Sequence, residues 1–200
     1  VGSEMCIRDR VIVVDGGQST RAVVGAFAGQ LDVEYQPCHP PGQLRQRRLG
    51  LERIRPHDKL VALLDDDIVL EPDALAQMIA FWNMAPSDTA GVGFNIVNAP
   101  PHKHSSLMGL FLASAPEQGR LLLSGRNTSI LNVQHDHATQ WLNGGATVWR
   151  ADIVLAHPQE ELQTRWAVGE DVRFSYPIGK RYRLFVCAKA RVRDVLAPDQ

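Results

Sequence analysis

The stretch from Leu60 to Leu75, LVALLDDDIVLEPDAL, decides the fold that we expect. It opens with a continuous apolar run of strand length, which is typical of a strand covered on both faces in a parallel α/β sheet. Three consecutive carboxylates follow, and Glu71-Pro72-Asp73 then has the features of a helix start. Leu75, Ile79 and Trp82 would share one face of that helix. The stretch therefore predicts a buried strand, an acidic loop and a helix.

The acidic loop consists of Asp65, Asp66 and Asp67, at the carboxyl end of the predicted strand. In open α/β sheets, ligands bind at this end, and acids packed so densely repel one another unless a cation or hydrogen-bond donors compensate them. A hard divalent metal is the simplest compensator, and Asp65 and Asp67 would face the same way. A solvated acidic turn is the alternative. The apolar strand in front of the loop favours a site for a metal and a diphosphate.

The overall composition is that of an ordinary soluble globular protein, with 44% hydrophobic and 22% charged residues among 200. The net charge of −1 supplies no basic field for nucleic-acid binding. No apolar run approaches the ~18 residues of a membrane span, which leaves only peripheral membrane contact open. Cys6, Cys38 and Cys187 have no metal or redox spacing, so we expect reduced thiols and a cytoplasmic protein.

The first ten residues, VGSEMCIRDR, resemble translated sequencing-adapter DNA. We therefore expect a non-native leader over residues 1–10 and a single domain over residues 11–200.

A second strand and its loop indicate a nucleotide site in the first quarter of the chain. Val11–Val14 is an apolar strand, Asp15 stands at its carboxyl end, and Gly16-Gly17 permits a tight turn before a helix. A carboxylate in such a place can accept hydrogen bonds from a base or a ribose, although Asp15 could equally be a plain turn residue. Arg47 and Arg48 fall on the next predicted helix, on a solvated face or directed at a phosphate.

Two segments near the end of the chain complete the candidate site. Trp141-Leu-Asn-Gly-Gly145 reads as a bend in which the glycines let backbone approach a ligand, and Trp141 is either a sugar-stacking platform or a core residue. Glu170 and Asp171 open a predicted helix, and an acid fixed at a helix start is a good general base. The other elements expected are strands over 31–35, 91–97, 129–134, 146–149, 182–188 and 191–195, and helices over 44–55, 72–85 and 151–156.

Taken in order, the motifs VIVVDGG, QRRLGL, LLDDDIVLEPDAL, WLNGGATVWR and GEDVRF resemble those of the family 2 glycosyltransferases with the GT-A fold. The resemblance runs from Val11 to about Val195. It implies a Rossmann-like α/β/α sandwich with a mostly parallel mixed sheet, from which the first strand is missing here. It also implies transfer of a sugar, with inversion, from a nucleotide-sugar donor to an acceptor hydroxyl, assisted by Mg²⁺ or Mn²⁺.

The resemblance assigns roles by motif. The donor would be bound by Asp15 at the nucleobase, Arg47 near the nucleotide, Asp65 near the ribose, and Asp66 beside it. Asp67 would be the metal ligand, and Asp194, which stands where the family often has a histidine, a second oxygen ligand. The sugar and acceptor side would consist of Trp141, Asn143, Gly144, Gly145 and Glu170, with Asp171 as the catalytic base. Arg48 departs from the family, in which asparagine is usual.

The implied partners are a nucleotide-sugar donor and a glycan or lipid-linked acceptor, as in bacterial cell-surface polysaccharide synthesis. Two other readings stay open. A nucleotidyltransferase also uses paired acids at a strand end and would release pyrophosphate. An inactive fragment or a carbohydrate-binding module would show no turnover.

Overall fold

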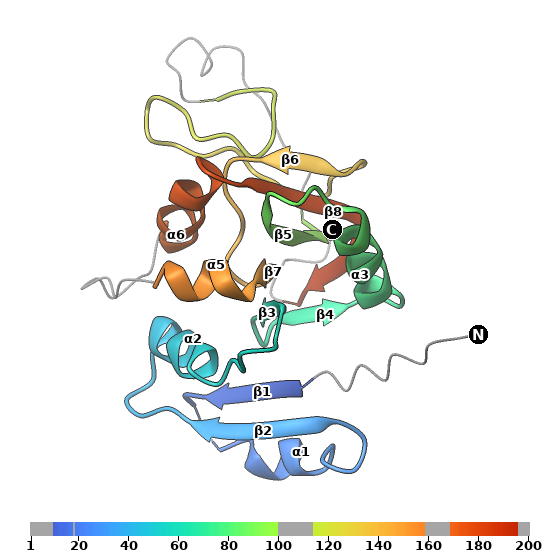
Figure 1. Ribbon diagram of the computed structural model, residues 1–200, viewed down its shortest axis with the longest axis vertical. Helices are drawn as coiled ribbons and strands as arrows, with labels where there is room; N and C mark the ends of the chain where they lie inside the picture. Colours follow the sequence, from blue (N-terminus) through green and yellow to red (C-terminus); the bar gives the residue numbers. More distant parts are fainter. Residues whose placement is uncertain (1–9, 18, 100–113, 159–168, 196–200) are drawn as a thin grey trace. The chain divides into compact units, whose positions relative to one another are not determined.

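The computed structural model describes residues 10–17, 19–99, 114–158 and 169–195 (Figure 1). The chain divides into two compact units. The N-terminal unit consists of Val1–Asp58 with Pro158–Gln163, and the C-terminal unit of Lys59–His157 with Thr164–Gln200. The expected leader lies outside the described ranges except for Arg10, which begins the first strand. None of the helices in these ranges combines the length and apolar character needed to cross a membrane.

The N-terminal unit is built on two parallel strands joined by a helix. β1 (Arg10–Asp15) pairs with β2 (Asp32–Pro37), and α1 (Arg21–Gly25) lies between them in the chain. A crossover of this kind is what parallel neighbours require. α2 (Gln43–Leu51) follows, and its Gln46 Nε2 donates a hydrogen bond of 2.9 Å to the carbonyl of Val14 in β1. The carboxyl end of β1 is thereby fixed to α2.

The C-terminal unit contains a mixed six-stranded sheet with the order β3-β7-β5-β8-β4, and β6 also pairs with β8. Its strands are β3 (Leu60–Leu64), β4 (Ile68–Leu70), β5 (Thr89–Ile96), β6 (His137–Thr139), β7 (Ala146–Arg150) and β8 (Arg183–Asp194). Its helices are α3 (Ala74–Met84), α5 (Ala151–Ala156) and α6 (Glu170–Gly179).

The expectation of a mostly parallel sheet is wrong for the described strands. In the six-stranded sheet only β5 and β8 run parallel; the other pairings are antiparallel. The apolar run of β3 gives no information on direction, which is set when β7 returns alongside it in antiparallel register. β3 also lies at the edge of the described sheet, with Leu60 39% and Leu64 44% exposed, instead of covered on both faces.

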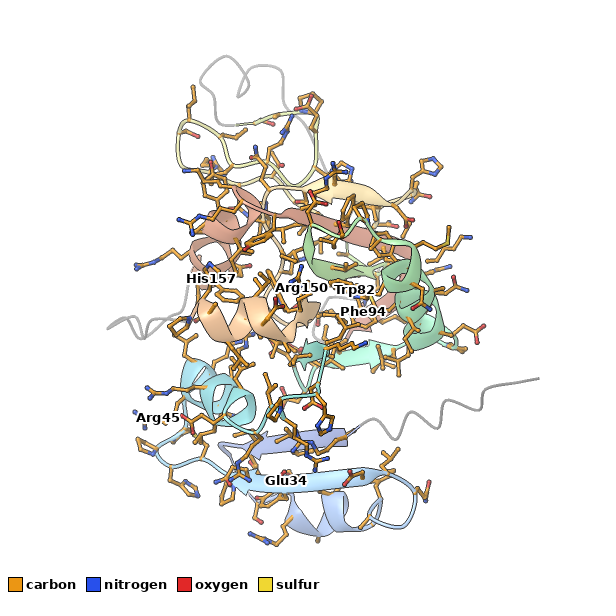
Figure 2. All side chains as sticks on the ribbon, in the orientation of Figure 1. Glu34, Arg45, Trp82, Phe94, Arg150 and His157 are labelled. Atoms are coloured by element: carbon orange, nitrogen blue, oxygen red, sulfur yellow. The ribbon has the colours of Figure 1, made fainter. Side chains whose placement is uncertain are left out.

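The core of the C-terminal unit lies between α3 and the sheet, and the fully buried residues of α3 are not Leu75 and Ile79. Ala74 and Met78 are buried, whereas Leu75 and Ile79 are 49% and 41% exposed. Helical neighbours lie three or four positions apart, so burial of Ala74 and Met78 turns the residues after each of them outward. Trp82 of α3 packs partly buried against this core, which also contains Phe94, Cys187 and Val192 (Figure 2). Burial raises the pKa of the Cys187 thiol, and Cys38 is likewise a buried free thiol.

Three strand predictions in the second half of the chain need correction, and the Asn95 side chain is involved in each. Residues 129–134 form no strand, and 182–195 form one strand with a bulge instead of two strands. Phe94 pairs with Cys187, but Asn95 pairs with Arg191. The Asn95 side chain, 2% exposed, fills the irregularity. It donates to the carbonyls of Val133 at 2.9 Å and Ala188 at 3.0 Å, and it accepts from the Val133 N–H at 2.9 Å. These backbone groups therefore pair with a side chain instead of a strand.

Candidate functional site

The acidic loop between β3 and β4 is held by backbone hydrogen bonds on both sides. The N–H of Asp65 donates to the carbonyl of Gly145 at 2.8 Å. The carbonyl of Asp67 accepts from the N–H of Val195 at 2.8 Å, directly after β8. The loop is thus attached to the Trp141–Gly145 segment at one end and to the end of β8 at the other. Motifs far apart in the sequence meet here.

Gly145 is required at its position by the Asp65 side chain. A Cβ atom on Gly145 would lie 2.4 Å from Asp65 Oδ2 and 2.8 Å from its Cγ. Only glycine leaves room for this carboxylate beside the backbone. The expected close approach of backbone at the glycine pair is therefore made to an acid of the loop itself.

Asp194 lies close enough to Asp67 for its charge to raise the pKa of the Asp67 carboxyl. Asp194 ends β8 opposite Ile68 of β4, and the Asn98 side chain binds its backbone N–H at 3.0 Å and its carbonyl at 2.7 Å. Burial raises the pKa of Asp67 above its ordinary value, and the negative charges of Asp194, Asp65 and Asp66 raise it further. Such a carboxylate is stabilised by any cation that reaches it.

The donor set agrees with a cation shared with a substrate. Across the ranges that the structure describes, no group of three or more His, Cys, Asp or Glu side chains could hold a metal ion alone. Mg²⁺ in proteins is usually held by one or two carboxylates together with substrate phosphates and water, not by a protein cage. The carboxylate oxygens of Asp67 and Asp194 are ligands of this kind, so the two residues fit that requirement.

The Trp141–Gly145 segment is joined to the first turn of α6. Leu142 N–H donates to Ser175 Oγ at 2.9 Å, and Ser175 Oγ lies 2.6 Å from the carbonyl of Asp171. Trp141 itself is only 4% exposed, so its ring packs in the core, as in the alternative reading. A sugar-stacking platform needs an exposed ring face, which Trp141 lacks in this structure.

The two acids of α6 differ in their surroundings. Glu170 is buried at 6% exposure, and Asp171 is half-buried, with Oδ1 accepting from the Val172 N–H at 2.8 Å. The helix begins after Gly169, whose φ of 80° lies in the left-handed region that favours glycine. The GEDVRF motif therefore produces the helix start that the sequence predicts, with Asp171 in its first turn.

Asp15 organises its own loop in the N-terminal unit. Its Oδ1 accepts from the Gly17 N–H at 2.9 Å. Its Oδ2 accepts from the Thr20 N–H at 2.8 Å, the Thr20 hydroxyl at 3.0 Å and the Tyr35 hydroxyl at 2.8 Å. The Thr20 amide, the Tyr35 hydroxyl and the Gly17 amide hold the pKa of Asp15 far below its ordinary value. These contacts are those of a turn carboxylate, the alternative left open above; a contact with a nucleobase stays a prediction.

α2 carries the arginines of the QRR motif. Arg47 is half-buried, whereas Arg48 is exposed and pairs with Glu52 at 3.2 Å on the solvated side of the helix. Gln46 was not among the residues predicted from the sequence, although it fixes α2 to β1 and its Oε1 would lie 2.6 Å from a Cβ on Gly16. Asn98 was not among them either. The only available signal was position: Gln46 opens the QRRLGL motif, and Asn98 directly follows the strand predicted over 91–97.

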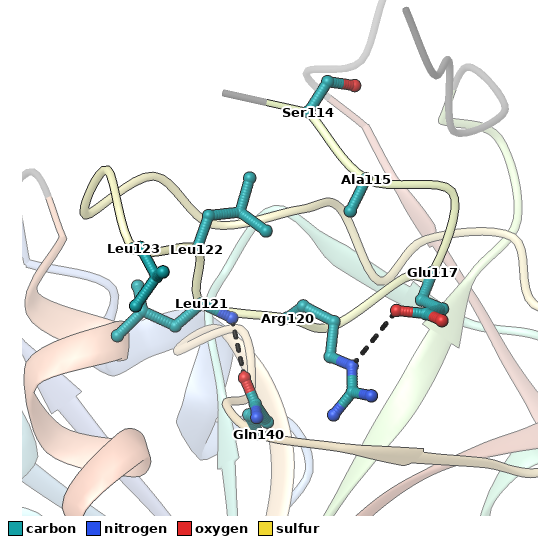
Figure 3. Close-up of a pocket in the computed structure, with 8 residues that line it drawn as sticks. All are labelled: Ser114, Ala115, Glu117, Arg120, Leu121, Leu122, Leu123 and Gln140. Carbon is teal, nitrogen blue, oxygen red and sulfur yellow. Dashed lines mark hydrogen bonds and ion pairs between the residues drawn. The ribbon is translucent and has the colours of Figure 1, made fainter. Parts of the chain in front are cut away.

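A cavity of about 290 Å³ is formed mainly by the loop before β6, together with Gln140 directly after that strand (Figure 3). An ion pair of 3.5 Å joins Arg120 to Glu117 at its edge, and Gln140 Oε1 accepts from the Leu121 N–H at 2.8 Å. Its lining consists of Ser114, Ala115, Glu117, Arg120, Leu121, Leu122, Leu123 and Gln140. None of the residues assigned from the sequence lines it, although Gln140 directly precedes Trp141.

Solved structures of TarS and of GalNAc-T7 are similar in fold to this chain. TarS from S. aureus, residues 1–349, matches with a TM-score of 0.57 and 15% identity over 90% of this chain and 48% of that one. The same protein in complex with UDP matches with a TM-score of 0.57 and 14% identity, over 90% and 48%. GalNAc-T7 with UDP, GalNAc and Mn²⁺ matches with a TM-score of 0.60 and 11% identity, over 94% and 38%.

These identities are too low to show more than the fold, and this chain spans less than half the length of those structures. No curated protein matches the chain. The model of the family described as "Glycosyltransferase like family 2" matches residues 8–199, which include every motif described above. The chain belongs to the glycosyltransferase family 2.

Proposed function

We propose that this chain transfers a sugar, with inversion, from a nucleotide-sugar donor to an acceptor hydroxyl, assisted by Mg²⁺ or Mn²⁺. The observation that carries the proposal is the contact between Asp65 and Gly145, which joins the acidic loop to the glycine segment within the C-terminal unit. Family membership supplies the reaction class.

Asp67 and Asp194 are the residues that would hold the cation. They suit it because the pKa of Asp67 is raised by burial and by neighbouring acids, of which Asp194 acts most strongly. A bound divalent ion would offset the negative charge that gathers on the leaving diphosphate. Asp65, placed against Gly145, and Asp66 are assigned to the donor beside it.

Asp171 is the proposed general base. The acceptor oxygen forms a bond to the anomeric carbon on the face opposite the diphosphate, and the bond from that carbon to the diphosphate oxygen breaks. The hydroxyl proton passes to the Asp171 carboxylate, and the nucleoside diphosphate leaves with the electron pair. Asn143, Gly144 and Glu170 are assigned to the sugar and acceptor side. Trp141 is buried, so we assign it a structural role within the Trp141–Gly145 segment instead of stacking on the sugar.

The nucleotide and acceptor classes are proposed by analogy with similar proteins. UDP is named in the similar TarS and GalNAc-T7 structures, so we propose a UDP-sugar donor, with Asp15 and Arg47 assigned to the nucleotide. The acceptor is proposed to be a glycan or a lipid-linked sugar of a bacterial cell surface, reached from the cytoplasm. The family match spans both compact units, which supports one catalytic domain over 11–200.

The test is binding followed by turnover in the full chain. A ligand at 100 times its Kd stabilises a protein by about 2.7 kcal/mol, so UDP with Mn²⁺ should raise the melting temperature by roughly 5–11 °C. EDTA should reverse that increase. Release of UDP from a panel of UDP-sugars would then support transfer. Pyrophosphate released from UTP would instead indicate a nucleotidyltransferase, and binding without any product an inactive fragment or binding module.

A further inference from the structure

Ser175 connects two motifs of the proposed site without belonging to either. It lies on α6 and is 1% exposed. Its hydroxyl oxygen accepts from the Leu142 N–H at 2.9 Å, and its single proton can be donated to the Asp171 carbonyl at 2.6 Å or, over a longer 3.5 Å, to the Leu142 carbonyl. The geometry of the 2.6 Å contact is the better one for a hydrogen bond, so the proton is donated to the Asp171 carbonyl. One side chain therefore bridges the Trp141–Gly145 segment and the turn that carries Asp171.

A second close approach brings the same side of α6 against Gln140, which directly precedes the Trp141–Gly145 segment. Gly179 lies one helical turn beyond Ser175, and a Cβ on it would lie 2.5 Å from the carbonyl of Gln140 and 2.9 Å from Leu184 Cδ1. Asp171, Ser175 and Gly179 are spaced four residues apart and so share one side of the helix. One hydrogen bond and one close approach of backbone therefore lie on the side of α6 that faces residues 140–142.

The path continues to the acidic loop. Gly145, at the end of the segment that contains Leu142, accepts the Asp65 N–H, and the Asp65 carboxylate occupies the space that a Cβ on Gly145 would take. Hydrogen bonds of 2.9 Å or less therefore link Asp65 to Gly145, and Leu142 through Ser175 to Asp171. The backbone from Leu142 to Gly145 joins these two links, and all of these residues lie inside the C-terminal unit.

We propose that Ser175 is a positioning residue, which sets the place of the Asp171 carboxylate relative to the acidic loop by tying the first turn of α6 to Leu142. The proposal rests on the role assigned to Asp171 under the proposed function. Ser175 contacts no substrate in it; it acts through Asp171.

The experiment compares Ser175→Ala with Ile178→Val in the full chain. Ile178 is fully buried on the same helix, and losing one methyl group loosens α6 without touching the link to Leu142. Because a misplacement of about 1 Å can reduce a rate by about 10²-fold, Ser175→Ala should lower kcat for UDP-sugar turnover by roughly 10- to 100-fold. The donor KM and the Kd of UDP with Mn²⁺ should stay unchanged, and Ile178→Val should keep the parent kcat. Equal losses of kcat in both variants would overturn the proposal.

Two further measurements separate the possible failures. Ser175→Thr keeps the hydroxyl and should recover most of the lost kcat; a Thr variant as slow as the Ala variant counts against positioning. If Ser175→Ala does not fold, hydrogen exchange of the Leu142 amide in the parent protein decides: protection supports the bond, and exchange as fast as in an open loop overturns it. If Asp171→Asn turns over donor at the parent rate, Asp171 is not the base and the proposed function fails at that step. If Asp171→Asn is inactive but Ser175→Ala is fully active, only the positioning role of Ser175 is refuted.

Discussion

Gly145→Ala tests the contact on which the proposed site depends. The new Cβ would lie 2.4 Å from Asp65 Oδ2, whereas ordinary contact begins at 3.4 Å, so the carboxylate must retreat by about 1 Å. Overpacking of this kind costs roughly 1–3 kcal/mol. Replacing glycine by alanine also lowers the conformational entropy of the unfolded chain. Where the native backbone suits alanine, this stabilises the folded protein by about 0.4–1 kcal/mol. The clash is the larger effect, so the variant should be less stable.

For a domain of this size, each kcal/mol shifts the melting temperature by roughly 2–4 °C, so a net loss of about 1–2 kcal/mol lowers it by roughly 2–8 °C. Calorimetry should show that UDP binding with Mn²⁺ weakens as well, because Asp65 has moved. Gly93→Ala is the matched control. Its Cβ would lie 3.2 Å from Leu142 Cδ2, a movable side-chain end, and it would leave Asp65 in place.

A double-mutant cycle gives the result that would refute this reasoning. In an Asp65→Ala background the colliding carboxylate is gone, and only the Asp65 Cβ position remains near, at 3.2 Å. Gly145→Ala should then cost at least about 0.5 kcal/mol less than in the parent, as expected for residues in contact. Equal costs in both backgrounds would show that the clash with Asp65 is not the cause.

Three further substitutions test individual carboxylates. At a pH above the raised pKa of Asp67, Asp67→Asn should stabilise the metal-free protein, because folding then no longer buries a negative charge close to Asp194, Asp65 and Asp66. The same variant should abolish the Mn²⁺ dependence of UDP binding. Thermal melts measure the first effect and calorimetry the second. Asp171→Asn should remove UDP-sugar turnover while UDP still binds, and retained turnover contradicts the assignment. Asp15 has a lowered pKa, so its contribution to stability is present above its ordinary pKa and is lost as pH falls below it. Asp15→Asn should therefore flatten the acid side of the stability profile followed by circular dichroism, and an unchanged profile would argue against its hydrogen bonds with Thr20 and Tyr35.

Local features of the sequence predicted local features of the structure. The apolar run before Asp15 is β1, the run before Asp65 is β3, and the helix expected over 151–156 has those bounds. Glu170 and Asp171 do open a helix. In each case the residues that form the element also carry the signal, so neighbours in the chain suffice.

Features that depend on distant partners could not be predicted in the same way. The direction of β7 against β3, the inward face of α3 and the burial of Trp141 are all settled by what packs against them. Asn95 shows the difficulty most clearly, because its side chain replaces the strand partner expected for Val133. The hydroxyl of Ser175 was equally invisible, since a serine on a helix face has no pattern that names its partner.

The bulge in β8 determines on which face of the sheet the Asp194 side chain lies. Residues on a strand alternate between its two faces, so the number of residues looped out between Cys187 and Arg191 decides which face every later side chain occupies. Removing one of them would invert that choice for the end of the strand and carry Asp194 away from Asp67. Among related chains, this part of β8 should therefore change in composition far more readily than in length.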